Sequence, residues 1–365
     1  MARPRLDHIA WAQRVPGAAR FDLASSAVAT PDLAAMGLPH RAGIDGDPFA
    51  TLDRLERALG ERLGAPGGRV LVTAGASEAN AAVFAGLLEP GDEVLVEHPG
   101  YEPLRAVPEF FGAEVRTFPR SPDLPVAAAV RPALGPRTKL VVLTHLHNPS
   151  GAALSERDVE ELEGLAGERE LRLLADETYR EAVAGEPATL ASRSRCWVAT
   201  STLTKVFGLG GLRVGWVAGD DRTRERSANA RNALSASPSQ PGIALALALV
   251  PHLDPLRARA HELLAANRAR WARFAGRHPE LEPDPAPRGV TTCLRVPVPG
   301  GGDALAAHAL ARHALAVTPG SFFGDDTLVR IALGGEPDVF ATALDALEQA
   351  VASFAGTRAV AGGTP

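Results

Sequence analysis

Lys205 is the residue whose type and surroundings best suit covalent chemistry. The chain has 365 residues, and only Lys139 and Lys205 are lysines among its 38 lysine and arginine residues. Arginine therefore serves almost wherever a positive charge is needed, and a retained lysine is a candidate for a task that arginine cannot perform. A lysine amine can lose its proton and attack a carbonyl, whereas a guanidinium stays charged.

The segment around Lys205 also carries groups that bind phosphate. It reads STLTKVFGLGGLRVGW over residues 201–216 and contains the hydroxyls of Thr202 and Thr204, glycines at positions 208, 210 and 211, and Arg213. Hydroxyls, a glycine-rich turn and an arginine favour a bound phosphate. An amine nucleophile beside such a site indicates a Schiff-base lysine that holds pyridoxal phosphate. The alternative is a glycine-rich loop with an ordinary surface lysine.

Length, charge and cysteine content limit the class of protein. The length allows two domains, and the 45% of hydrophobic residues can supply a sizeable core. A net charge of −5 without a basic run argues against nucleic acid or an anionic membrane as partner. Cys196 and Cys293 lie far apart, so we expect no disulfide framework and a cytoplasmic protein. The longest apolar run, residues 243–250, is too short to span a bilayer, and we expect no metal site.

Apolar strands alternate with helices through the first two thirds of the chain. The strands are expected at residues 69–73, 93–97, 113–118, 139–144, 171–175, 197–201 and 212–218. Among the helices, one follows Thr51 and ends at Gly64, one begins with Ser77 as its cap, and one begins with Ser155 as its cap. This alternation predicts an α/β fold whose large domain has a mostly parallel seven-stranded sheet covered by helices.

The pattern divides the chain into four parts. Residues 1–45 have little regular pattern and are expected to pack on the smaller domain. Residues 46–250 form the large domain, and residues 251–355, where the character of the pattern changes, form a smaller C-terminal α/β domain. Residues 356–365 are expected to be a disordered tail.

Polar residues follow several of the expected strands. Ser77 opens the helix after the first strand, Asn148 follows the fourth, Asp176 the fifth and Lys205 the sixth. Ligands of parallel sheets bind outside the carboxyl ends of the strands. We therefore expect these residues to meet at one edge of the sheet.

Three kinds of side chain near that edge suit a pyridine ring. A carboxylate at Asp176 can pair with a protonated ring nitrogen and make the ring an electron sink. Asn148 and Tyr179 can hydrogen-bond the ring oxygen, and Tyr101 can stack on the ring face. The alternatives are a helix cap or turn for Asp176, an Asn-Pro turn for Asn148, and simple packing for the two tyrosines.

Two further features suit anions. The backbone N–H groups of Ala76 and Ser77 begin a helix and can hold a phosphate, although ordinary helix capping explains them as well. Arg330 lies in the apolar segment TLVRIALGG, where an arginine needs an anionic partner. That partner is either the carboxylate of a substrate or an internal salt bridge.

Six motifs occur together in one order. They are TAGASEA (73–79), HPGYEPL (98–104), HNPSG (147–151), ADETY (175–179), STLTKVFGLGGLRVGW (201–216) and VRIALG (329–334). In these motifs the sequence resembles fold type I pyridoxal-phosphate enzymes of the class I/II aminotransferase group, the aspartate aminotransferase superfamily. The resemblance covers residues 21–355.

The resemblance implies a role for each candidate residue. Lys205 would form the Schiff base with pyridoxal phosphate and act as general base and acid at the substrate α-carbon. Asp176 would pair with the ring nitrogen, and Tyr101 would stack on the ring. Asn148 and Tyr179 would bind the ring oxygen, and Arg330 would hold the substrate carboxylate. The phosphate would be bound by four residues: Ala76, Ser77, Thr202 and Arg213.

The function that follows from the resemblance is transfer of the amino group of an α-amino acid to a 2-oxo acid. A lyase, cyclase or decarboxylase on the same scaffold, like C–S lyases or threonine-phosphate decarboxylases, is the alternative. A non-catalytic regulator is a remote third, because Lys205 is present and no segment is left for a DNA-binding domain. The resemblance also implies a homodimer, but residues 40–48 lack the tyrosine that relatives often supply to the partner subunit.

Overall fold

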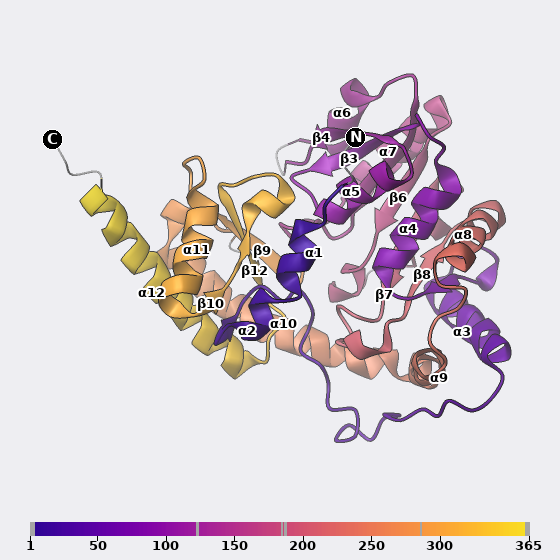
Figure 1. Ribbon diagram of the computed structural model, residues 1–365, viewed down its shortest axis with the longest axis horizontal. Coiled ribbons are helices and arrows are strands. Elements are labelled where there is room, and N and C mark those ends of the chain that lie inside the picture. Colours follow the sequence, from indigo (N-terminus) through magenta and orange to yellow (C-terminus); the bar gives the residue numbers. More distant parts are fainter. Residues whose placement is uncertain (1–3, 122–123, 184, 186–187, 285–286, 362–365) are drawn as a thin grey trace.

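The computed structural model describes residues 4–121, 124–183, 185, 188–284 and 287–361 (Figure 1). Within these residues a large α/β body surrounds one sheet, and a smaller α/β body lies beside it. The long helix α10 (Leu253–Arg277) runs between the two bodies. The predicted fold class, with a large and a smaller part, is confirmed.

The large sheet is mostly parallel, as predicted. Over the described residues its strands lie in the order β2-β8-β7-β6-β5-β3-β4, and only β8 runs antiparallel to its neighbours β2 and β7. Each of the seven predicted strands is present. Their bounds are Leu71–Thr73 (β2), Glu93–His98 (β3), Glu114–Pro119 (β4), Thr138–Thr144 (β5), Arg172–Asp176 (β6), Trp197–Thr202 (β7) and Gly215–Ala218 (β8).

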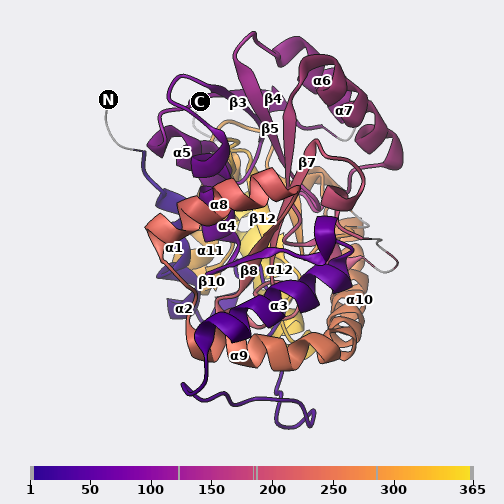
Figure 2. The same ribbon diagram turned by 90° about the vertical axis from the view of Figure 1, so that its right-hand side faces the viewer.

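Helices cover both faces of this sheet. On β3, Val94 and Val96 pack against α4 and α5, whereas Leu95 between them packs on the other face against α6 and α7. The period of two along each strand thus puts alternate residues into two different cores. Helix α8 lies beside α4 (Figure 2). The helices are Pro48–Leu63 (α3), Ala76–Leu87 (α4), Glu102–Phe110 (α5), Val126–Val130 (α6), Glu156–Arg169 (α7), Asp221–Leu234 (α8) and Gln240–Leu249 (α9).

Two of the expected helix ends are confirmed and one is wrong. Gly64 ends α3 in the left-handed region, and Ser155 caps α7 in a reciprocal pair of hydrogen bonds with Asp158. Helix α4, however, starts two residues earlier than expected, with Gly75 rather than Ser77 as its cap. Ser77 therefore lies inside the first turn, and its exposed side chain does not cap the helix.

The smaller body packs helices on short strands. Over the described residues its antiparallel sheet has the order β11-β12-β9, and strand β10 pairs in parallel with β1 near the N-terminus. This pairing ties the N-terminal segment to the smaller body and supports our proposal that residues 1–45 pack on it. The remaining elements are Asp7–Ala12 (α1), Val15–Ala18 (α2), Phe21–Asp22 (β1), Thr291–Arg295 (β9), Gly301–His313 (α11), Leu315–Ala316 (β10), Thr318–Pro319 (β11), Leu328–Ala332 (β12) and Pro337–Ala361 (α12).

The boundary between the two bodies falls inside helix α10. Leu253 and Leu256 belong to the core of the large body, whereas Ala260, Leu263 and Leu264 belong to the core of the smaller one. The division near residue 250 remains our proposal, and this change of core supports it.

The C-terminal end differs from the expectation in part. Helix α12 continues through Ala361, so residues 356–361 are helical where a disordered tail was expected. Residues 362–365 of the expected tail lie outside the described residues. In the part of the chain that the structure describes, no helix combines the length and hydropathy needed to cross a bilayer.

Candidate active site

A cavity of about 470 Å³ lies at the carboxyl edge of the large sheet, and the smaller body and helix α1 contribute to its wall. The residues that follow β2, β5, β6 and β7 all reach it, which is the convergence that the sequence predicts. All ten candidate residues line the cavity: Ala76, Ser77, Tyr101, Asn148, Asp176, Tyr179, Thr202, Lys205, Arg213 and Arg330.

Lys205 and the turn after it are held at this edge by contacts with residues 26–29 of the N-terminal segment. Its Nζ donates a hydrogen bond to Ser26 Oγ at 3.1 Å, and its carbonyl accepts one from the Val28 N–H at 2.8 Å. Gly208 follows with φ +69°, and a Cβ there would lie 2.8 Å from the Ala29 carbonyl oxygen. Only glycine allows this close approach. Among the described residues, no carboxylate lies within ion-pair distance of the amine, so it is available to a ligand.

Asp176 ends β6 and is buried, with its carboxylate held by two donors. Oδ1 accepts from the Thr178 N–H at 3.0 Å, and Oδ2 accepts from Asn80 Nδ2 at 2.9 Å. Thr200 Oγ1 donates to Asn80 Oδ1 at 2.6 Å, which fixes the orientation of that amide. Burial raises the pKa of Asp176, and the donors and nearby Lys205 oppose that rise. A cationic ligand atom would favour the ionised form further.

The sequence interpretation missed Asn80 and Thr200. A signal for Asn80 exists, because it lies three residues after Ser77 on α4 and therefore faces the same way. No comparable signal marks Thr200, whose hydroxyl is one of several on β7. Thr202, two residues further along β7, has its Oγ1 2.7 Å from the Val214 carbonyl oxygen.

Arg330 and Asn148 contact each other at the cavity wall. Arg330 Nη1 donates to Asn148 Oδ1 at 3.2 Å, and Nη2 donates to the Ala24 carbonyl at 2.8 Å and to Thr318 Oγ1 at 3.0 Å. This contact orients the Asn148 amide, whose Nδ2 can donate to another acceptor.

The internal salt bridge considered for Arg330 is absent from the described residues. The side chain is only 3% exposed, and no described carboxylate lies within 4.0 Å of its guanidinium. Its Nε has no hydrogen-bond partner there either. A buried cation without a counterion is costly. An anion that enters the cavity would offset this cost.

The turn before α4 forms a backbone cradle at the helix N-terminus. Gly75 has φ +92°, and a Cβ on it would lie 2.8 Å from Arg213 Nη2. A Cβ on Gly215 of β8 would lie 2.4 Å from the Gly75 carbonyl carbon. Glycine at both positions brings Arg213 and the free N–H groups of Ala76 and Ser77 close together. Such a cradle suits a phosphate group.

Tyr101 and Tyr179 also line the cavity. Burial raises the pKa of Tyr101, and the ring meets the His8 imidazole edge to face at 5.6 Å. His8 was not among the candidates, and its six-residue helix α1 gives no strong sequence signal. Burial, with Arg330 and Lys205 nearby, lowers the pKa of His8 to about 3 and keeps it neutral.

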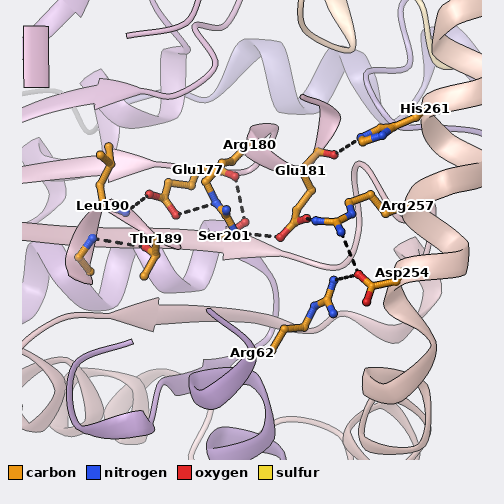
Figure 3. A network of polar contacts seen from close by, with 11 residues as sticks. Arg62, Glu177, Arg180, Glu181, Thr189, Leu190, Ser201, Asp254, Arg257 and His261 are labelled. Atoms are coloured by element: carbon orange, nitrogen blue, oxygen red, sulfur yellow. Dashed lines mark hydrogen bonds and ion pairs between the residues drawn. The ribbon is translucent and has the colours of Figure 1, made fainter. Parts of the chain in front are cut away.

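A network of charged side chains connects the loop after β6 to α10 (Figure 3). Glu177 accepts from the Leu190 N–H at 2.7 Å and faces Arg180, which pairs with Glu181 at 2.8 Å. Arg257 of α10 then pairs with Glu181 at 3.2 Å. Glu177 thus has a structural role, and the network braces the loop that directly follows Asp176.

Comparisons with known proteins agree with this geometry. Residues 46–347 match the family model described as aminotransferase class I and II. Capreomycidine synthase of Streptomyces vinaceus is 33% identical over 287 residues, which cover 76% of this chain and 74% of that protein. Arginine–pyruvate transaminase AruH of Pseudomonas aeruginosa is 33% identical over 294 residues, covering 77% and 73%. The solved structure of the PLP-dependent cyclase OrfR has a TM-score of 0.83, 25% identity, and coverage of 96% and 97%.

The cavity, its lysine and its phosphate cradle define the class as a pyridoxal-phosphate enzyme of fold type I. The chain belongs to the aminotransferase class I and II family. The residues present fit the cofactor, because glycine at positions 75 and 215 lets Arg213 and the N-terminus of α4 approach each other, and Asp176 is buried with two donors.

Proposed function

We propose that the protein transfers the amino group of an α-amino acid to a 2-oxo acid, with Lys205 as its catalytic residue. The observation that carries the proposal is the buried Arg330 guanidinium without a described counterion, in the same cavity as Lys205. An amino acid and an oxo acid share the carboxylate that such an arginine binds.

Most of the cavity residues would hold pyridoxal phosphate, which when bound acts as an electron sink for the substrate α-carbon. Asp176 would pair with the ring nitrogen, and Tyr101 would stack on the ring. Asn148 Nδ2 and the Tyr179 hydroxyl would donate to the ring oxygen. The N–H groups of Ala76 and Ser77, with Thr202 and Arg213, would bind the phosphate.

The remaining chemistry is proton transfer and orientation. Lys205 would take a proton from the substrate α-carbon and return one, since it is the amine beside the ring site. Ser26 Oγ accepts a hydrogen bond from Nζ in this structure and would steady the amine. Arg330 would fix the substrate carboxylate and so direct the α-hydrogen toward Lys205.

A half-reaction tests transamination directly. An amino acid added without an oxo acid should remove the visible absorbance of the cofactor and release one oxo acid per site, and a 2-oxo acid should then restore the absorbance. Retention of the visible band with every proteinogenic amino acid would contradict transamination.

A lyase, cyclase or decarboxylase reaction in the same site is the second candidate. The similarity to capreomycidine synthase and to the fold of the cyclase OrfR favours keeping it. These reactions regenerate the starting form of the cofactor without an amino acceptor. Multiple turnovers with one substrate, with release of ammonia, pyruvate or carbon dioxide or with cyclic product, would therefore support this candidate over transamination.

We further propose that the protein is a cytoplasmic homodimer. Free Cys196 and Cys293 support a reducing compartment. The segment between β1 and α3 loops away from the body (Figure 1), and Ile44 and Phe49 are 79% and 74% exposed. Apolar side chains so exposed fit a surface that a second copy covers. Sedimentation velocity should give twice the mass of one chain, and a monomer at micromolar concentration would contradict this.

A further inference from the structure

Glu97 is a buried acid outside the cavity whose contacts lead directly to it. It lies near the carboxyl end of β3, and its side chain has no exposed surface. Oε1 accepts two hydrogen bonds from Thr144 at the end of β5, from the N–H at 2.7 Å and from Oγ1 at 2.5 Å. Thr144 itself lines the cavity.

The Thr144 hydroxyl passes this contact on to Asn148. A hydroxyl has one proton, and Thr144 gives it to Glu97, which leaves the oxygen lone pairs as acceptors. One of them accepts the Asn148 N–H at 2.9 Å. The carboxylate of Glu97 therefore decides which way the Thr144 hydroxyl points, and the hydroxyl fixes the backbone of Asn148.

We propose that Glu97 and Thr144 are positioning residues that hold Asn148 in place to donate to the cofactor ring oxygen. This inference rests on the proposed function, because it gives Asn148 the role of a cofactor ligand. Neither residue needs to touch the reacting atoms, and neither was marked by the sequence motifs.

Burial and the charges nearby shift the pKa of Glu97. Burial raises the pKa of Glu97 to about 7, which Arg120 opposes and Asp176 reinforces. Arg120 Nε lies 3.7 Å from Oε2, and Oε2 has no hydrogen-bond partner among the described residues. His147, in the loop after β5, stays neutral because burial and Arg120 lower its pKa to about 3.

The chain contains a matched control at the other end of the same strands. Glu93 at the start of β3 accepts from Thr138 Oγ1 of β5, and Arg116 of β4 pairs with Glu93 at 3.2 Å. Thr138 Oγ1 likewise accepts a loop N–H, that of Gly135, at 2.8 Å. This second set has the same chemistry, but none of its members lines the cavity. Variants of this second set therefore show whether an effect arises from any such contact between the strands or from a role in the site.

The test is a pH titration of the visible absorbance of the cofactor-loaded protein. A hydrogen bond donated to the ring oxygen favours the ionised form of that oxygen. Loss of the hydrogen bond should therefore raise the pH at the midpoint of the titration. Thr144→Val and Glu97→Leu should each raise it by about 0.5 unit or more, a threefold change in proton affinity. Thr144→Ser and Glu97→Gln keep the hydroxyl and the acceptor, so their midpoints should stay close to that of the wild type.

The control variants are Thr138→Val and Glu93→Leu, and the melting temperature of every variant is measured beside its midpoint. We expect the controls to lose stability without moving the midpoint. Equal shifts in the controls, or no shift in Thr144→Val, would overturn the positioning role. If Glu97→Leu does not fold, Thr144→Val with Thr144→Ser decides alone. A colourless wild type would instead contradict the proposed function.

Discussion

Replacement of Lys205 by alanine is expected to reduce turnover by about 10³-fold or more while cofactor binding persists. In the proposed function the amine both bonds to the cofactor and acts as acid–base at the substrate, and loss of a general acid–base alone costs about 10²- to 10⁴-fold. The cradle before α4 and the Asp176 carboxylate make no hydrogen bond to Lys205 among the described residues, so in the variant they would still hold the cofactor. Steady-state kinetics and equilibrium dialysis of the variant measure the two effects.

Lys139 provides the control, because it is the other lysine of the chain and lies exposed on β5. Lys139→Ala should keep wild-type turnover. Borohydride reduction of the coloured wild type followed by peptide mass spectrometry should label the Lys205 peptide and leave the Lys139 peptide unlabelled. Full activity of Lys205→Ala, or a label on Lys139, would remove the basis of the proposed function.

Replacement of Arg330 by alanine is expected to raise the substrate KM by about 10- to 100-fold with a smaller effect on kcat. Hydrogen bonds to a charged group contribute about 1.5–3 kcal/mol, and the carboxylate loses them in the ground state and the transition state alike. The substitution also frees Asn148 Oδ1, which Arg330 now contacts. A drop in kcat is therefore expected as a secondary effect.

A substrate analogue separates carboxylate binding from structural damage. The amine that lacks the carboxylate should bind wild type and Arg330→Ala equally, because it never uses the guanidinium. Arg231 is a matched control, since it is also a buried arginine and donates to the Val72 carbonyl at 3.1 Å, but does not line the cavity. An unchanged KM for the amino acid in Arg330→Ala would contradict the assignment.

Much of the fold followed from local pattern. Each strand of the large sheet is a short apolar run between turn residues, and a buried parallel strand needs little else. The caps of α3 and α7 followed from Gly64 and Ser155 for the same local reason. The start of α4 was predicted wrongly, because Gly75 takes the cap position instead of Ser77. A glycine is needed there, since its φ is positive and Arg213 approaches it closely.

The sequence by itself determined which residues are candidates for the chemistry, since Lys205, Asp176, Asn148 and Arg330 stand in recognisable motifs. Which residues support them was decided by the tertiary structure. Ser26 meets Lys205 across 179 positions, and Asn80 meets Asp176 across 96. The physical reason is that a hydrogen bond between distant segments depends on how strands and helices pack. No local spacing encodes that packing.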